Sequence, residues 1–487
     1  MIAAVATPRR LVVAMVLVGV VAAGAAAPGA WARATAETRT TADEPQYLLT
    51  AISLAEDADL DIADERAAAR YRPFHPVGLP LQERARADGS LVSPHDPLLP
   101  VLLAGPVALG GWLAAKLALA GLAGGLAAAM VWVTVRRFEV PVGTAVVAVL
   151  AFSLAAPLVV YGTQVYPEVP AALAVTVGIG ALTGPLRGRG VATLVGVAVA
   201  LPWLSVKYVF VAAALVVLAL VRLARRDGPG DRRLLLAMVG GLGVCGVAYL
   251  ASHQALYDGW TVYASGDHFT GGEGTVVGTD PALAGRAHRL TGLLVDRDFG
   301  LAAWQPAFLL VVPALAALVR ARSSGAWVLV VPLVVGWLGA TFVALTMHGW
   351  WWPGRQVVVV LPCAVLAVAW WAARHAAVRS VLAAGVFVGA GIAAWSAVEV
   401  LLGHHTLIVD FDATANPLVR AWRALLPDGR ATPAGTDGLR LLWYVVLAGL
   451  AAAGWHSARA PRPAEPPPPT PILVPRPREQ PCSTVMS

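Results

Sequence analysis

Several side chains able to do chemistry lie at the ends of long apolar runs in this sequence. Ionisable groups near hydrocarbon are costly, so such positions are candidates for function. Acids there can accept a proton from a hydroxyl group, whereas arginine and lysine can bind an anion such as phosphate. The candidates are Asp43, Glu44 and Glu168 for catalysis, and Lys207, Tyr208, His348, Trp351 and Arg355 for substrate binding.

Most of these residues also have a purely structural interpretation. Asp43 stands where a helix N-cap is expected, with a proline early in the first turn. Glu168 can stabilise a first turn through the helix macrodipole. Lys207 and Arg355 can extend toward lipid headgroups, and the tryptophans at 350–352 can form an interfacial aromatic belt. At Asp43 both interpretations can hold, because a capping residue can also act as a base.

The composition places these residues in a membrane protein. The chain has 487 residues, of which 58% are hydrophobic and 13% charged, and its mean hydropathy is +0.68. Soluble globular proteins are less apolar and more charged. We therefore expect an all-α polytopic membrane protein with about twelve transmembrane helices, within a range of about ten to thirteen. The expected spans are 11–31, 112–135, 141–161, 167–185, 190–204, 208–223, 234–256, 300–319, 326–347, 356–373, 380–402 and 439–456.

The positions of arginine predict the orientation of these spans. Basic residues flank every second junction between apolar runs, so both termini are expected to be cytoplasmic in a multi-pass plasma-membrane protein. Three long segments, about 33–97, 257–299 and 404–438, are then extracytoplasmic. The same distribution accounts for the net charge of +7, so no nucleic-acid partner is expected. Cleavage of the first run as a signal peptide is an alternative that leaves this sidedness unchanged.

The first outer segment contains two further helical pieces. Apolar residues between Tyr47 and Ala55 recur at helical spacing, which predicts an amphipathic helix on the outer membrane surface. Residues 97–111 are apolar but interrupted by proline and glycine, which favours an interfacial or re-entrant piece. The acids between Glu56 and Glu65 are expected to form a solvated face. A multi-span domain is expected over 1–456, followed by a Pro-rich disordered cytoplasmic tail at 457–487.

Six motifs occur together in an order that is typical of one superfamily. They are "DEPQYLLTAISLAEDADLDI", "HDPLLPVLLAGPVALGG", "QVYPEVPAALAV", "LPWLSVKY", "DRDFGLAAWQPAFLL" and "WWWPGRQVVVVLP". In this order, and on one side of the membrane, they resemble the GT-C superfamily of membrane glycosyltransferases, which use polyprenyl-phosphate sugars. The superfamily includes protein mannosyltransferases and mycobacterial arabinosyltransferases, and the resemblance covers roughly residues 1–455.

The resemblance implies inverting transfer of a hexose or pentose from a polyprenyl-phosphate donor on the outer membrane face. Asp43 matches the acid that acts as general base, Glu44 is the other candidate, and Glu168 matches a second acid that shapes the site. The implied partners are this donor, membrane lipids and a glycan, lipid or protein acceptor. We expect no large soluble C-terminal domain of the kind that many relatives use for acceptor binding, so the resemblance does not imply which acceptor is used.

Three questions stay open at this level. Some superfamily members require a divalent cation, Mg²⁺ or Mn²⁺, and Asp43, Glu44 and Glu168 could hold one. The histidines and cysteines show no metal-ligand spacing, so no metal site is predicted from them. The alternative functions are a transporter or flippase of a lipid-linked intermediate and a non-catalytic scaffold. Polar groups at span ends, rather than at the bilayer midplane, favour the enzyme over the transporter.

Overall fold

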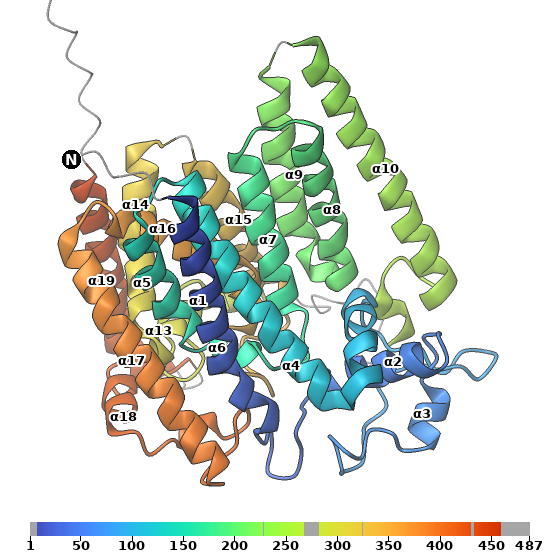
Figure 1. The fold of residues 1–487 in the computed structure, drawn as a ribbon. Helices are drawn as coiled ribbons and strands as arrows, with labels where there is room; N and C mark the ends of the chain where they lie inside the picture. Colours follow the sequence, from blue (N-terminus) through green and yellow to red (C-terminus); the bar gives the residue numbers. More distant parts are fainter. Residues whose placement is uncertain (1–6, 227, 267–281, 324, 430–432, 459–487) are drawn as a thin grey trace, which may run out of the picture.

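The computed structural model describes residues 7–226, 228–266, 282–323, 325–429 and 433–458. Its regular structure is helical, and within these ranges the only β features are two isolated bridges, Asp61–Val92 and Glu83–Gly266. Figure 1 shows long helices side by side, with the start of α1 near the top and α2 and α3 at the bottom.

Eight of the described helical segments are long and apolar enough to cross a membrane. This confirms the expected all-α polytopic membrane protein. Three of the segments reach this length through adjoining turns, which are η2 (Val206–Tyr208), η6 (Gly339–Val343) and η7 (Arg355–Val360). The eight helices are α1 (Pro8–Ala26), α4 (Leu98–Arg137), α9 (Val209–Ala224), α10 (Pro229–Tyr257), α15 (Ala326–Leu338), α16 (Leu361–Ala372), α17 (Ala376–Leu401) and α19 (Pro433–Ser457).

Four further apolar helices coincide with the other expected spans but are shorter. A straight helix needs about 20 residues to cross the hydrocarbon core, and none of the four has more than 17 residues. The expected total of about twelve spans is therefore not confirmed. The four helices are α5 (Val142–Ser153), α7 (Glu168–Thr183), α8 (Gly188–Leu204) and α14 (Val311–Ala321).

The helices differ in how deeply they are buried. Every residue of α16 is buried, so this helix forms the centre of the bundle. The helix α10 contributes few buried residues and stands at one edge in Figure 1. Between α1 and α4 the backbones approach closely, because a Cβ atom on Gly124 would lie 2.5 Å from the carbonyl oxygen of Gly19. Small residues permit such approaches between membrane helices.

The first outer segment folds into α2 (Glu44–Glu56) and α3 (Ala63–Ala67). The expected helix at Tyr47–Ala55 forms, but residues 44–53 are all buried and α2 packs against α4. It therefore lies within the protein and not on the membrane surface, because apolar spacing does not distinguish lipid from protein as the covering layer. Within α4, Gly110 and Gly111 have non-helical backbone angles. This break falls at the end of the segment 97–111, whose expected interfacial or re-entrant position stays a prediction.

Short helices connect the longer ones. Of the segment expected as a disordered tail, residues 459–487 lie outside the described residues. The short α-helices are α6 (Leu158–Tyr161), α11 (Leu283–Arg286), α12 (Arg289–Val295), α13 (Leu301–Trp304) and α18 (Pro417–Arg423). The turn η6 is π-helical, and the other short turns are 3₁₀: η1 (Ala27–Trp31), η3 (Val262–Ser265), η5 (Pro306–Leu310) and η8 (Phe411–Ala413).

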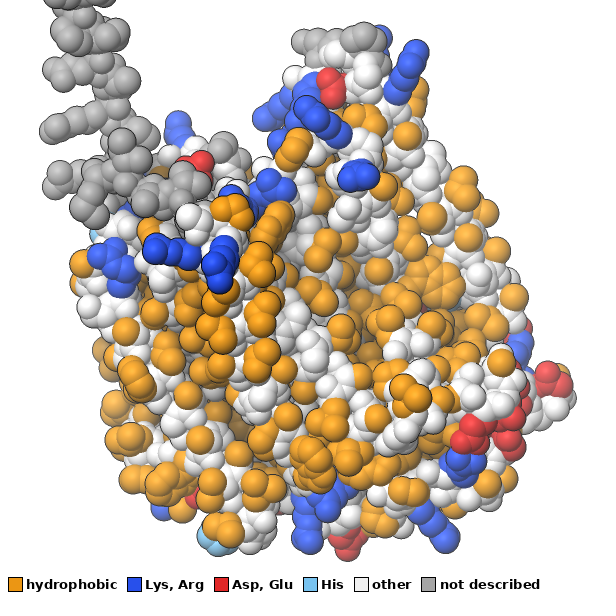
Figure 2. All heavy atoms as spheres, in the orientation of Figure 1, with side chains coloured by type: hydrophobic (Ala, Val, Ile, Leu, Met, Phe, Trp, Pro, Cys, Tyr) orange, Lys and Arg blue, Asp and Glu red, His pale blue; other side chains and the backbone are white. Residues whose placement is uncertain are grey.

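Charged side chains separate toward the two ends of the bundle. At one end, Arg137 donates to the carbonyl oxygen of Gly180 at 3.0 Å and Arg226 donates to that of Leu186 at 3.2 Å. Figure 2 shows Lys and Arg gathered along the upper end, hydrophobic side chains over the middle, and a mixture of acidic and basic side chains at the bottom and lower right. A basic end followed by an apolar belt is the pattern expected of oriented membrane helices.

Candidate functional site

Four charged side chains from four separate segments meet beside the start of α2. The helix α2 lies at the lower end of the molecule in Figure 1. Arg355 lies between two acids, with Nη2 2.7 Å from Oδ2 of Asp43 and Nε 3.1 Å from Oε1 of Glu168. Lys207 Nζ donates to the same Glu168 oxygen at 2.8 Å. The structure thus brings together four of the residues that the sequence marked as candidates.

Each of these residues stands at or near the start of a helical element. Asp43 directly precedes α2, Glu168 opens α7, Lys207 lies in η2 and Arg355 opens η7. Gly354 turns the chain into η7 with a φ of +85°, and a Cβ atom there would lie 2.7 Å from a leucine side chain. Glycine is therefore required at this position, where it sets the direction from which Arg355 enters the site.

The cluster is mostly shielded from solvent. The Glu168 side chain has no exposed surface and that of Arg355 is 8% exposed, whereas about a quarter of Asp43 and of Lys207 is accessible. Two carboxylates face two cations, so the formal charges balance. The Arg355 guanidinium also lies 4.0 Å from the ring centroid of Tyr166, which fixes its plane from a third direction.

Asp43 occupies the N-cap position of α2, but its side chain makes no capping hydrogen bond. The carboxylate instead faces Arg355, and Nε2 of His95 lies 3.7 Å from its Oδ1. Burial acts to raise the pKa of Asp43, but Arg355 and His95 outweigh it and hold this pKa well below its usual range. The carboxylate is therefore ionised at neutral pH, and it is a weak base for as long as Arg355 stays paired with it.

Glu44 is directed away from this cluster. Its two carboxylate oxygens accept hydrogen bonds from the backbone N–H groups of Thr41 at 2.9 Å and of Val165 at 2.8 Å. Lys116 Nζ lies 3.6 Å from the same side chain, which is fully buried. These contacts join the start of α2 to the segment before α7, and so they set the distance between Asp43 and Glu168.

An apolar cavity of about 270 Å³ begins at the cluster. Lys207 and Arg355 lie on its wall, and most of the remaining wall comes from α9, α15, η6 and η7. Tyr208 and Trp351, two predicted binding residues, also line it. Two other lining residues are about half exposed, Phe210 at 49% and Leu345 at 45%. The cavity therefore reaches the side of the bundle, where lipid is expected.

A second, more polar cavity of about 170 Å³ adjoins the first. Its wall includes Asp43, Tyr47 and His95. Lys207 and Arg355 line both cavities, so the two cations stand where the apolar and the polar spaces meet. A ligand with an apolar tail, a central anion and a polar head matches this arrangement.

The remaining predicted binding residue lies elsewhere. His348 packs edge-on against Phe299, with ring centroids 4.8 Å apart, and lines neither cavity. The three consecutive tryptophans also separate: Trp350 is 65% exposed, Trp351 lines the apolar cavity, and Trp352 is buried. Three identical neighbouring residues thus lie in three different environments: the protein surface, the cavity wall and the buried core. Their shared residue type does not predict which tryptophan takes which environment.

Asp96 is a site residue that the sequence reasoning missed. It lines the polar cavity, is 2% exposed and accepts hydrogen bonds from Val206 N at 2.8 Å and from His253 Nε2 at 3.2 Å. The Tyr249 hydroxyl donates to it as well, at 3.2 Å. These contacts hold the turn that carries Lys207. The sequence does contain a signal for this polar contact. Tyr249, His253 and Tyr257 recur at four-residue spacing, which places their side chains on one face of α10.

The cluster retains unused hydrogen-bonding capacity. Among the described residues, Glu168 Oε2 and the Tyr208 hydroxyl are buried without a hydrogen-bond partner. Arg355 engages its two acids through Nε and Nη2, and no hydrogen bond from its Nη1 occurs within the described part of the chain. Buried polar atoms are normally paired, so the Glu168 and Tyr208 atoms are suited to contacts with a bound ligand.

Comparisons of the chain with protein-family models, curated proteins and solved structures find no match. The indications of function at this site are therefore its own residues and the motifs in the sequence.

Proposed function

We propose that the chain is an inverting membrane glycosyltransferase that moves a sugar from a polyprenyl-phosphate donor to an acceptor hydroxyl. The motifs that resemble the GT-C superfamily support this proposal. The observation that carries it is the position of Arg355, which pairs with Asp43 and lies on the wall shared by the apolar and polar cavities. A lipid-linked phosphosugar has the same succession of apolar chain, anion and polar head.

The donor is proposed to bind with its prenyl chain in the apolar cavity. Its phosphate then lies between Lys207 and Arg355, and its sugar enters the polar cavity beside Asp43. Arginine and lysine are the usual partners of phosphate, and Arg355 has Nη1 available for a charge-assisted bond. The acceptor, which is a glycan, a lipid or a protein, approaches the sugar from the side of Asp43.

In the proposed reaction, the acceptor oxygen forms a bond to the anomeric carbon while the bond from that carbon to the phosphate oxygen breaks. The acceptor proton passes to Asp43, and the electron pair leaves with the polyprenyl phosphate. Attack from the face opposite the phosphate inverts the anomeric configuration. Lys207 and Arg355 stabilise the negative charge that develops on the leaving group.

Arg355 also links donor binding to the strength of the base. While it pairs with Asp43 at 2.7 Å, the pKa of that carboxyl is held low. A donor phosphate competes for the guanidinium, so its binding weakens the ion pair and raises the pKa of Asp43 toward its usual range. The base is thus proposed to become effective only when the donor is in place.

The charge balance leads us to propose that this centre works without Mg²⁺ or Mn²⁺. Asp43 and Glu168 already face Arg355 and Lys207. A divalent metal ion between the two acids would have to displace the side chain of Arg355 or Lys207. Glu44 is not available as a further ligand, because its carboxylate accepts hydrogen bonds from two backbone N–H groups. The donor set therefore does not fit a metal ion.

We further propose that the site faces the extracytoplasmic side of the plasma membrane. The arginine-rich ends of α4 and α9 lie at the end of the bundle opposite α2 (Figures 1 and 2). Under the positive-inside rule, that end and both termini are cytoplasmic. The donor is then used on the outer membrane face.

A tryptophan at Gly339 is expected to block the proposed prenyl cavity. Gly339 lines the cavity, and no atom lies within 4 Å of a Cβ added there, so the indole has room to enter. Binding of a photoreactive polyprenyl-phosphate sugar to the full chain in proteoliposomes should fall at least about tenfold, equivalent to about 1.4 kcal/mol.

Gly240→Trp is the matched control for this experiment. Gly240 also has open space around its Cβ position, but it lies on α10 and lines neither cavity. Photolabelling of the control should equal that of the wild type. Equal labelling of the Gly339 variant and the wild type would exclude the apolar cavity as the donor site.

A further inference from the structure

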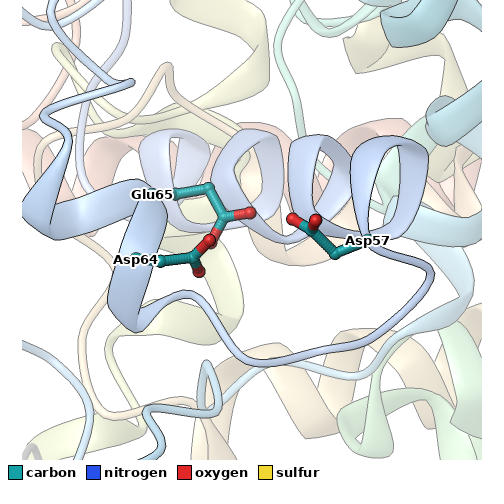
Figure 3. Close-up of side chains that lie close together, drawn as sticks. All are labelled: Asp57, Asp64 and Glu65. Carbon is teal, nitrogen blue, oxygen red and sulfur yellow. The ribbon is translucent and has the colours of Figure 1, made fainter.

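A separate group of acids lies at the far end of α2. Asp57 follows the last residue of α2, and Asp64 and Glu65 lie in α3. One carboxylate oxygen from each of the three lies within 4.8 Å of those of the others. Figure 3 shows the Glu65 side chain directed toward Asp57, with the carboxylate of Asp64 beside it.

Glu65 is the unusual member of this group. It is 3% exposed, and among the described residues both of its carboxylate oxygens are buried without a hydrogen-bond partner. The expectation of a solvated acidic face is therefore wrong for this residue, because α3 folds back and covers it. Burying a carboxylate without a partner is costly.

No basic side chain in the described part of the chain forms an ion pair with Asp57, Asp64 or Glu65. The two arginines nearest in the sequence form ion pairs with other acids: Arg70 pairs with Glu56, and Arg66 pairs with Glu83. Burial and the nearby carboxylates of Asp64 and Asp57 raise the pKa of Glu65 to about 8. The three acids therefore have no ion-pair partner among the described residues, and Arg70, which pairs with Glu56, acts on Asp57 and Glu65 only at longer range.

We propose that Asp57, Asp64 and Glu65 bind a divalent cation of the calcium type. Ca²⁺ is bound by oxygen ligands at about 2.3–2.6 Å, so ligand oxygens on opposite sides of the ion lie about 4.6–5.2 Å apart. Oxygens within 4.8 Å of one another fit this spacing. Water supplies the remaining ligands, since Asp57 and Asp64 are exposed.

The ion would fasten α3 to the end of α2. The helix rises about 1.5 Å per residue, which places Asp57 about 21 Å from Asp43 along α2. The proposed cation is therefore too far away to take part in transfer, and its role is structural. This inference is independent of the proposed glycosyltransferase activity.

The test uses the full chain, purified in detergent and stripped of metal with a chelator. Radioactive Ca²⁺ should then bind at one saturable site and raise the melting temperature. Glu65→Gln and Asp57→Asn should each weaken binding at least about tenfold, the least that is expected on losing an ion ligand.

Glu37→Gln is the matched control, because Glu37 is an exposed acid in the same outer segment. It should bind Ca²⁺ as the wild type does. In chelator, Glu65→Gln should melt no lower than the wild type, since the change removes a buried acid, so a misfolded variant is not expected. Absence of saturable Ca²⁺ binding, or equal binding by Glu65→Gln and the wild type, would overturn the proposal.

Discussion

Replacing Asp43 with asparagine is expected to slow sugar transfer by about 10²- to 10⁴-fold, the usual contribution of a general base. Asparagine has nearly the same size, but it cannot accept the acceptor proton. Donor affinity should not fall, because Arg355 and Lys207 remain in place and the phosphate no longer competes with a carboxylate at position 43 for Arg355. The loss should therefore appear in the turnover rate, measured with saturating polyprenyl-phosphate sugar in membranes that contain the native acceptors.

Asp88→Asn is the control for this substitution. Asp88 is an exposed acid in the same outer segment, and within the described part of the chain its carboxylate accepts hydrogen bonds only from Ser90. Its transfer rate should match that of the wild type. Full transfer activity in the Asp43 variant would remove the general base from the mechanism, even if the donor were still bound.

Replacing Arg355 with alanine is expected to have the largest combined effect on stability and donor binding. Arg355 is the only described partner of Asp43 other than His95, and it shares Glu168 with Lys207. Removing one partner of a buried ion pair costs about 3–5 kcal/mol. The melting temperature of the purified chain should fall accordingly, and binding of a polyprenyl-phosphate sugar should be lost.

Arg355→Lys separates these two effects. Lysine keeps the charge that the buried acids require, but it lacks the planar fork of arginine. This variant should stay folded and bind the donor at least about tenfold more weakly. Arg374→Lys makes the same change at the other end of α16, where the guanidinium stacks on Trp370, and should bind the donor normally. Unchanged donor affinity in Arg355→Lys would show that Arg355 does not bind the phosphate.

The sequence predicted which charged residues share one end of the bundle. Asp43, Glu168, Lys207 and Arg355 are all placed there by the alternation of apolar runs and arginine-rich junctions, and the structure brings all four together. It did not predict that one arginine contacts both acids. That contact depends on how α2, α7 and η7 pack, and on the backbone turn at Gly354.

Other features could not be read from local patterns. Asp43 and Glu44 are adjacent and chemically similar, yet Glu44 is fully buried on two backbone N–H groups. The apolar spacing in α2 indicated one buried face, whereas ten consecutive residues of α2 are buried. Glu65 lies in a run of exposed acids and is covered only because α3 folds back. In each case a tertiary contact, absent from the local pattern, decides the environment.

The measurement that tests the central claim most directly is whether the chain makes a glycosidic bond. Proteoliposomes of the full chain would receive polyprenyl phosphates carrying radiolabelled hexose or pentose, with an extract of its native membranes as the source of acceptors. We predict one polyprenyl phosphate released for each sugar transferred, and both products formed about 10²- to 10⁴-fold more slowly with Asp43→Asn. Labelled donor that crosses the bilayer intact, at the same rate in both proteins and with no polyprenyl phosphate released, would contradict the account.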